Sequence, residues 1–91
     1  MSRRVVVTGI GAVSPCWNNA AETWESMVEA RSGVGPITRF DCESWPVSIA
    51  AEVKGFDGTA LLGRRVAKRM GEFTRYAAVA ADEAVADAGL D

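Results

Sequence analysis

The sequence predicts an incomplete α/β fold, in which a strand, a helix, a second strand and then further helices follow one another along 91 residues. Val5–Ile10 is a continuous run rich in β-branched residues, and such a run suits a strand that is covered on both faces. Residues 20–31 and 72–88 carry apolar side chains at the spacings of amphipathic helices. Residues 1–91 are therefore expected to form part of one domain.

The first helix is expected over residues 20–31. Asn19 is a suitable N-cap, and Glu22 follows it at the position that completes a capping box. The apolar stripe of this helix comprises Trp24, Met27 and Val28, with the stem of Arg31 beside them. Ser32 and Gly33 are expected to end the helix.

The middle of the chain is expected to contain one further strand. Residues 33–46 form an irregular stretch that Pro36 and Pro46 interrupt. Residues 47–53 follow the alternation of a strand, with Val47, Ile49, Ala51 and Val53 on one face.

The last third of the chain is expected to be mainly helical from Thr59 onward, with Gly63 and Gly71 as weak points. The final helix should cover residues 72–88, with Gly89 as the residue that ends it. Its expected core positions are Phe73, Tyr76, Ala77, Ala80, Ala84 and Ala88. So many alanines allow a helix to approach its neighbour closely.

Composition excludes several classes of protein. Hydrophobic residues make up 48% and charged residues 24%, which is typical of a folded soluble domain. The net charge of −2 provides no overall basic field for nucleic acid. No apolar run reaches the ~18 residues of a membrane span. Thr8, Gly9 and Gly11 interrupt the first apolar run too early for a signal peptide, so we expect a cytoplasmic protein.

The residue inventory predicts no metal and no cofactor. The sequence contains no histidine, which removes every mechanism built on an imidazole base or ligand. Cys16 and Cys42 lack CxxC spacing and are expected to be reduced thiols.

The glycines after the first strand invite a dinucleotide-binding interpretation, which the neighbouring residues oppose. Ser14 stands where a third glycine is needed, and Pro15 and Trp17 follow where a helix should open. We therefore expect Gly9 and Gly11 to allow close packing by a neighbouring element instead.

A set of motifs runs along the whole chain in order and without gaps: segments 5–15, Thr23-Trp24, 31–37, 39–41, 51–57, Lys68-Arg69-Met70, Phe73, Tyr76-Ala77 and 86–91. Together these motifs resemble the amino-terminal part of the β-ketoacyl-acyl-carrier-protein synthases, most closely the elongating synthase of type II fatty-acid synthesis. Polyketide ketosynthases are the nearest relatives to confuse with it.

The resemblance implies a thiolase-like fold of layered helices and sheets (α/β/α/β/α), of which this chain holds the first portion. It implies an acyltransferase that condenses a cysteine-bound acyl group with malonyl-ACP after loss of CO₂, and a homodimer at full length. The family's nucleophilic Thr-Ala-Cys motif, two histidines and catalytic lysine would follow position 91. Cys16 and Cys42 match no part of that motif, so no catalytic residue is assigned.

Four positions depart from the family's pattern. Val66, Gly71 and Arg75 stand where the family usually has an acidic residue, an aspartate and a glutamine. Trp17 replaces a usual glycine. If that position needs a positive φ, tryptophan costs about 1–2 kcal/mol there.

One candidate site lies within the chain. Arg64, Arg65, Lys68, Arg69 and Arg75 are half of all ten basic residues. On a helix with about 100° per residue, the first four share one basic face, while Val66, Ala67 and Met70 point inward. Such a face is ordinarily just solvated. In the family, however, the matching stretch contacts the acidic acyl carrier protein, so Arg64, Arg65, Lys68 and Arg69 are predicted to dock that partner.

Three hypotheses remain open for the chain: a partial ketosynthase, a non-catalytic module that binds the carrier protein, and a remnant without function. We predict that the 91-residue chain alone is inactive. We also predict that it is poorly soluble, because Val5–Ile10 would present an apolar strand whose partners are absent.

Overall fold

The computed structural model describes residues 2–90 and contains two compact units. The first unit comprises Met1–Ala12 and Asp57–Asp91, and the second comprises Val13–Phe56. Among the described residues, no large side chain is fully buried; the buried residues are Gly58, Ala67 at 0% exposure and Ser26 at 6%. The chain thus forms local structure without a large core.

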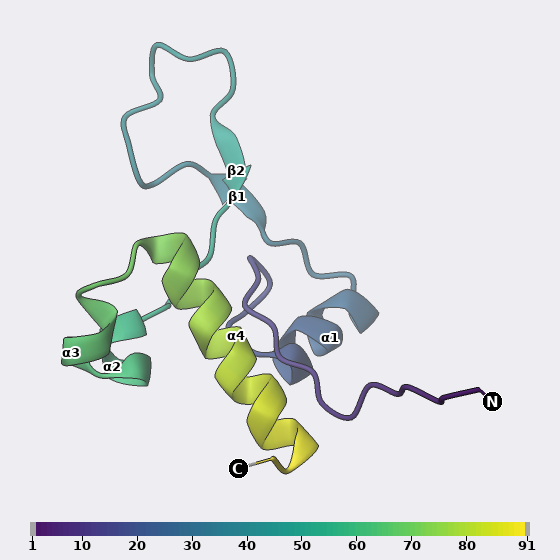
Figure 1. Ribbon diagram of the computed structural model, residues 1–91. Coiled ribbons are helices and arrows are strands. Elements are labelled where there is room, and N and C mark those ends of the chain that lie inside the picture. The colour runs from purple at the N-terminus through teal and green to yellow at the C-terminus, as the bar shows by residue number, and fades with distance from the viewer. Residues whose placement is uncertain (1, 91) are drawn as a thin grey trace. The chain divides into compact units, whose positions relative to one another are not determined.

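Three helices build the first unit (Figure 1): α2 at Gly58–Leu62, α3 at Arg64–Ala67 and α4 at Glu72–Ala88. The predicted breaks are confirmed, because Gly63 lies between α2 and α3 with φ of 86° and Gly71 precedes α4. The Asp57 side chain starts α2 by accepting a hydrogen bond of 3.0 Å from the amide of Ala60.

The bounds predicted for the last helix agree with α4, and its end is also confirmed. Gly89 adopts the left-handed conformation with φ of 72°. Its amide donates to the Ala86 carbonyl, and the Leu90 amide donates to the Val85 carbonyl, each at 3.1 Å. These two bonds form a Schellman motif, which satisfies carbonyls that the helix leaves open.

The core stripe predicted for α4 is only partly correct. Tyr76, Ala80, Ala84 and Ala88 are half-buried, but Phe73 is 81% exposed and Ala77 is exposed as well. The reason is that the segment at Gly9 and Gly11 lies against Ala80, Ala84 and Ala88, one turn or more away from Phe73.

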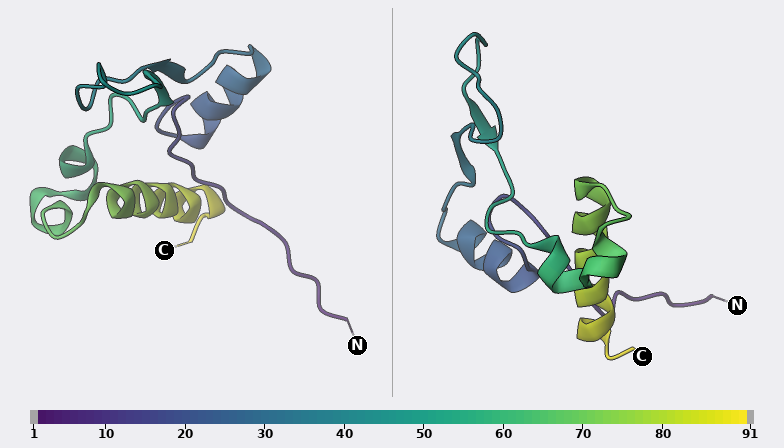
Figure 2. Two further views of the ribbon diagram at one scale, coloured as in Figure 1. Left: turned by 90° about the horizontal axis from the view of Figure 1, so that it is seen from above. Right: turned by 90° about the vertical axis from the view of Figure 1, so that its left-hand side faces the viewer.

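The expected strand at Val5–Ile10 forms no ladder in the described structure, and this prediction is wrong for the chain as it stands. Residues 2–8 run away from α4 as extended chain (Figure 2), with Val5 at 92% exposure and Val7 at 80%. A strand is held by hydrogen bonds to a neighbouring strand, and residues 2–90 provide none here.

The second unit begins with helix α1 at Ala20–Val28, which ends three residues earlier than predicted. The predicted N-cap is confirmed: Asn19 Oδ1 accepts a hydrogen bond of 2.8 Å from the Glu22 amide. Ala30 ends the helix with φ of 57°. The Arg31 amide then bonds the Ser26 carbonyl at 2.8 Å, so Ser32 and Gly33 lie beyond the helix.

Two short strands form the only sheet within residues 2–90. Strand β1, Val34–Pro36, pairs antiparallel with strand β2, Ile49–Ala51. The predicted second strand is thus confirmed at its centre, whereas part of the stretch expected to be irregular forms its partner. Ile49, expected on one face with Ala51, is 57% exposed. A two-stranded hairpin cannot supply the layers of sheet between helices that the resemblance implies.

The condition under which Trp17 would be strained, a positive φ, is not met. Ala30 is the one non-glycine residue with positive φ among residues 2–90. Trp17 instead forms a bridge with Ser14, through amide-to-carbonyl bonds of 2.9 and 3.2 Å. Its indole ring lies against Gly55, whose φ of 63° favours glycine.

Candidate functional site

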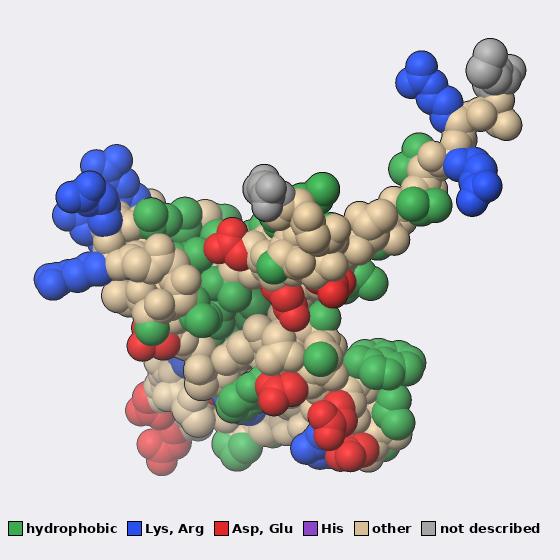
Figure 3. Space-filling model, turned by 90° about the horizontal axis from the view of Figure 1, so that it is seen from below, with side chains coloured by type: hydrophobic (Ala, Val, Ile, Leu, Met, Phe, Trp, Pro, Cys, Tyr) green, Lys and Arg blue, Asp and Glu red, His purple; other side chains and the backbone are tan. Residues whose placement is uncertain are grey.

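The four predicted docking residues lie on α3 and the turn that follows it. Arg64 and Arg65 open the helix, and Lys68 and Arg69 follow its last residue. All four side chains are exposed. We call these four residues the basic surface. Lys and Arg side chains gather at one corner of the face shown in Figure 3, without Asp or Glu among them.

The turn after α3 is tighter than the continuous helix that the sequence predicted. The Lys68 amide still bonds the Arg64 carbonyl at 3.2 Å, but the Arg69 and Met70 amides reach back only three residues, to Val66 and Ala67. Ala67 is fully buried and Met70 is half-buried, as predicted. Val66 is 47% exposed, so the prediction that it packs inward is wrong.

The charges of the basic surface are not neutralised locally. Within residues 2–90, none of these four side chains takes part in a hydrogen bond or ion pair. Exposed cations without internal partners keep their full attraction for an external anion. The fifth basic residue of the region, Arg75, is instead only 26% exposed in its side chain and turns toward the end of α3.

Residues 9–12 form the second notable site, at the surface of α4. A Cβ added at Gly9 would meet Ala88 at 2.7–2.8 Å, and one added at Gly11 would meet the Ala84 amide nitrogen at 2.8 Å. Two carboxylates of α4 fix the same segment. Asp87 accepts from the Ile10 amide at 3.0 Å, and Glu83 accepts from the Ala12 amide at 2.9 Å. The glycines therefore serve close helix packing, as the sequence predicted.

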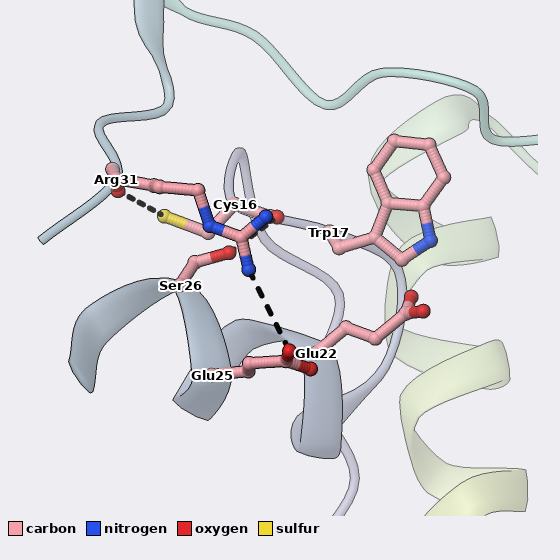
Figure 4. Close-up of a pocket in the computed structure, with 6 residues that line it drawn as sticks. All are labelled: Cys16, Trp17, Glu22, Glu25, Ser26 and Arg31. Carbon is pink, nitrogen blue, oxygen red and sulfur yellow. Dashed lines mark hydrogen bonds and ion pairs between the residues drawn. The ribbon is translucent and has the colours of Figure 1, made fainter. Parts of the chain in front are cut away.

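A pocket of about 310 Å³ lies in the second unit (Figure 4). Its lining residues are Cys16, Trp17, Glu22, Glu25, Ser26 and Arg31. Ser26 Oγ donates to the Cys16 carbonyl at 3.3 Å, and the Arg31 guanidinium faces Glu25 at 4.0 Å. No pattern in the sequence indicated this pocket, because it depends on the early end of α1, which turns Arg31 back toward the helix.

The pocket contains no recognisable catalytic arrangement. Its thiol, Cys16, is 3.9 Å from the Arg31 carbonyl oxygen, and the sequence has no histidine to activate it. Cys16 and Cys42 are both free thiols. Within residues 2–90, no group of three or more metal-binding side chains comes together. In the same range, no helix has the length and apolar character of a membrane span.

A carboxylate also fixes the loop of the hairpin in the second unit. Glu52 accepts hydrogen bonds from Thr38 Oγ1 at 2.8 Å and from the Thr38 and Arg39 amides at 3.2 and 3.3 Å. The Thr38 hydroxyl is the main reason that the pKa of Glu52 lies below its ordinary value. Bonds to the charged form favour that form.

Comparison with known proteins decides the ancestry. The family described as "Beta-ketoacyl synthase, N-terminal domain" matches residues 2–91. The chain belongs to this family. It is 46% identical over 88 residues to "3-oxoacyl-[acyl-carrier-protein] synthase 2" of Synechocystis sp., covering 97% of this chain and 21% of that protein. The protein of the same description in Staphylococcus aureus (strain COL) is 46% identical over 90 residues, with coverage of 99% and 22%.

The structural comparison agrees. A chain of "The ishigamide ketosynthase/chain length factor" superposes with a TM-score of 0.88 at 39% identity. The match covers 98% of this chain and 22% of the other. This β-ketoacyl synthase chain thus has the fold of the corresponding portion of a ketosynthase, and it spans about a fifth of the length of the relatives it matches.

Proposed function

We propose that the chain is the amino-terminal part of a 3-oxoacyl-ACP synthase of fatty-acid synthesis, a cytoplasmic enzyme that is homodimeric at full length. The observation that carries this proposal is the match over residues 2–91 together with the 46% identity to synthases of that description. The complete enzyme would condense an acyl thioester with malonyl-ACP and release CO₂. A polyketide ketosynthase is the alternative, and the descriptions of the relatives that are 46% identical support the fatty-acid type.

The 91-residue chain alone should not catalyse this condensation. It contains no histidine, and neither Cys16 nor Cys42 matches the family's nucleophile. Incubation with malonyl-ACP and an acyl-ACP should therefore release CO₂ no faster than a blank without protein. Turnover above that blank by a pure preparation would contradict the assignment.

We further propose that the basic surface binds an acyl carrier protein. Four exposed cations without internal partners suit an acidic partner, and complementary charge mainly increases the association rate and fixes the register of docking. Half-buried Met70 and buried Ala67 hold the backbone of this surface against the first unit, so its cations are displayed from an ordered turn.

Titration with acyl carrier protein tests the docking proposal. Binding should weaken as salt increases, because ions screen exposed charges. The triple variant Arg65→Glu, Lys68→Glu, Arg69→Glu should lose at least about tenfold in affinity. The control variant Arg3→Glu, Arg4→Glu changes charges in the same unit outside the basic surface and should bind almost as the original does. Equal binding by the triple variant and the original chain would exclude this surface.

An autonomous carrier-binding module is the second candidate, and the same uncompensated charges favour it. The two candidates predict different coding sequence after position 91. An in-frame Thr-Ala-Cys motif followed by two histidine motifs would support a complete enzyme, and a stop after position 91 would support the module or a remnant.

A further inference from the structure

One side chain connects the basic surface to α4 and lies outside that surface. Arg75, in the first turn of α4, donates from Nε to the Ala67 carbonyl oxygen at 3.1 Å. Ala67 is the last residue of α3 and is fully buried. Because the last carbonyls of a helix lack partners within it, a guanidinium donor from another helix stabilises that end.

The Ala67 carbonyl accepts two hydrogen bonds, one from the turn that follows α3 and one from α4. The Met70 amide donates to it at 3.0 Å, which closes the turn containing Lys68 and Arg69. Arg75 donates to it from α4. Two members of the basic surface therefore belong to a turn whose closing carbonyl is fixed from the neighbouring helix.

Glu72 holds the guanidinium in this position. Its Oε1 is 3.9 Å from Arg75 Nη1, one helical turn away. The Arg75 side chain is 26% exposed, and that of Glu72 is 53% exposed. At 3.9 Å and half exposed, the ion pair is the weaker of the two contacts.

We propose that Arg75 is a positioning residue for the basic surface: it fixes the turn at Lys68 and Arg69 in the conformation that meets an acidic partner. This inference rests on the docking function proposed above. A surface fixed in its bound conformation loses less conformational entropy on binding, so its affinity is higher than that of a mobile turn with the same charges. Arg75 itself makes no contact with the partner in this account.

The test compares three variants of the chain with acyl carrier protein as the titrant. Arg75→Met keeps the unbranched stem of the side chain to about the position of Nε and removes the donor and the positive charge, and it should weaken binding about five- to tenfold. Arg75→Lys keeps a donor and the charge, and it should restore most of that loss. Glu72→Gln leaves the bond to Ala67 in place and should change affinity less than Arg75→Met does.

Amide hydrogen exchange of the chain without carrier gives an independent result. Arg75→Met should accelerate exchange at Met70, whose amide closes the turn, while amides in the centre of α4 exchange as before. Combining Arg75→Met with the triple variant of the basic surface should produce no further loss of affinity, because the residue acts through that surface.

The outcomes separate the two proposals. If the original chain does not bind carrier at all, the docking function itself is wrong. If the original chain binds and Arg75→Met binds equally well, only the positioning role is overturned. A loss that Arg75→Lys does not restore, with unchanged exchange at Met70, would also overturn it.

Discussion

Adjacent halves of the opening segment have opposite environments. Gly9–Ala12 lies against α4, whose backbone and Ala88 side chain leave no room for a Cβ at either glycine and whose Glu83 and Asp87 bind two of its amides. Val5–Thr8 precedes it directly and is exposed throughout, with Val5 at 92%. Val5–Thr8 has the stronger strand propensity, but Gly9–Ala12 makes the contacts with α4.

The difference shows what a chain of this length can hold in place. A carboxylate on a helix can accept a hydrogen bond from a single amide of a neighbouring extended segment. Such a segment can therefore be held in place without a second strand. A β-branched run needs the continuous hydrogen bonds of a neighbouring strand, and residues 2–90 do not supply them. Local structure is therefore stabilised here by helices and caps, whereas the expected strand Val5–Ile10 has no partner strand among residues 2–90.

The largest loss of stability should come from Gly11→Ala, which disrupts the packing of residues 9–12 against α4. The added Cβ would meet the Ala80 carbonyl and the Ala84 amide nitrogen, which belong to helix backbone and cannot move aside. We expect the free energy of unfolding to fall by about 2–3 kcal/mol, measured by urea unfolding. Gly35→Ala is the matched control, because a Cβ there meets nothing within 4 Å. Equal losses for both variants would contradict the packing account.

Removing the carboxylates should loosen the same half to a smaller extent. Glu83→Ala deletes a part-buried bond and should cost about 1 kcal/mol, and Asp87→Ala, whose bond is exposed, should cost less. Hydrogen exchange should accelerate at Ala12 and Ile10, respectively. Asp82→Ala, at an exposed position of α4, should leave both amides unchanged. Slow exchange that persists in all three variants would disprove the role of the carboxylates.

The hairpin provides a pH test of the same kind of contact, a carboxylate that accepts hydrogen bonds from backbone amides. The pKa of Glu52 lies below its ordinary value of 4.5, mainly through the Thr38 hydroxyl. Its stabilising contribution should thus be present above about pH 4.5 and be lost as the pH falls through the lowered pKa. The stability difference between the original chain and Glu52→Gln should shrink over that range in unfolding curves. A difference that is constant with pH would rule out this contribution.

The smallest change in stability should come from a substitution in the exposed segment Val5–Thr8. Val7→Thr changes a side chain that is 80% exposed, so the free energy of unfolding should move by less than about 0.5 kcal/mol. The concentration at which the chain precipitates should rise, because an exposed apolar strand promotes association. A clear loss of stability would show that Val7 is buried in solution.

The sequence predicted features that depend on a few neighbouring residues. Asn19 caps α1 and Gly89 ends α4 as expected, because the required atoms are close in the chain. The breaks at Gly63 and Gly71 belong to the same class. The basic surface was also located from sequence, since four cations so close together share exposure whether the turn is helical or not.

Features that depend on distant partners could not be predicted. The β1 segment has poor strand propensity and pairs because residues 49–51 lie beside it. Ala30 adopts a conformation that favours glycine, so the end of α1 was placed too late. The link from Arg75 to Ala67 and the pocket at Cys16 likewise arise from tertiary contacts that no local pattern encodes.

The most direct test of the central claim, that the chain presents a carrier-docking surface without catalytic machinery, is chemical-shift mapping of the isotope-labelled chain during titration with acyl carrier protein. We expect the largest chemical-shift changes at residues 64–69, and we expect them to decrease in high salt, while the amide signals of residues 5–12 do not move. Shifts that centre on residues 5–12, or that are unaffected by salt, would contradict it.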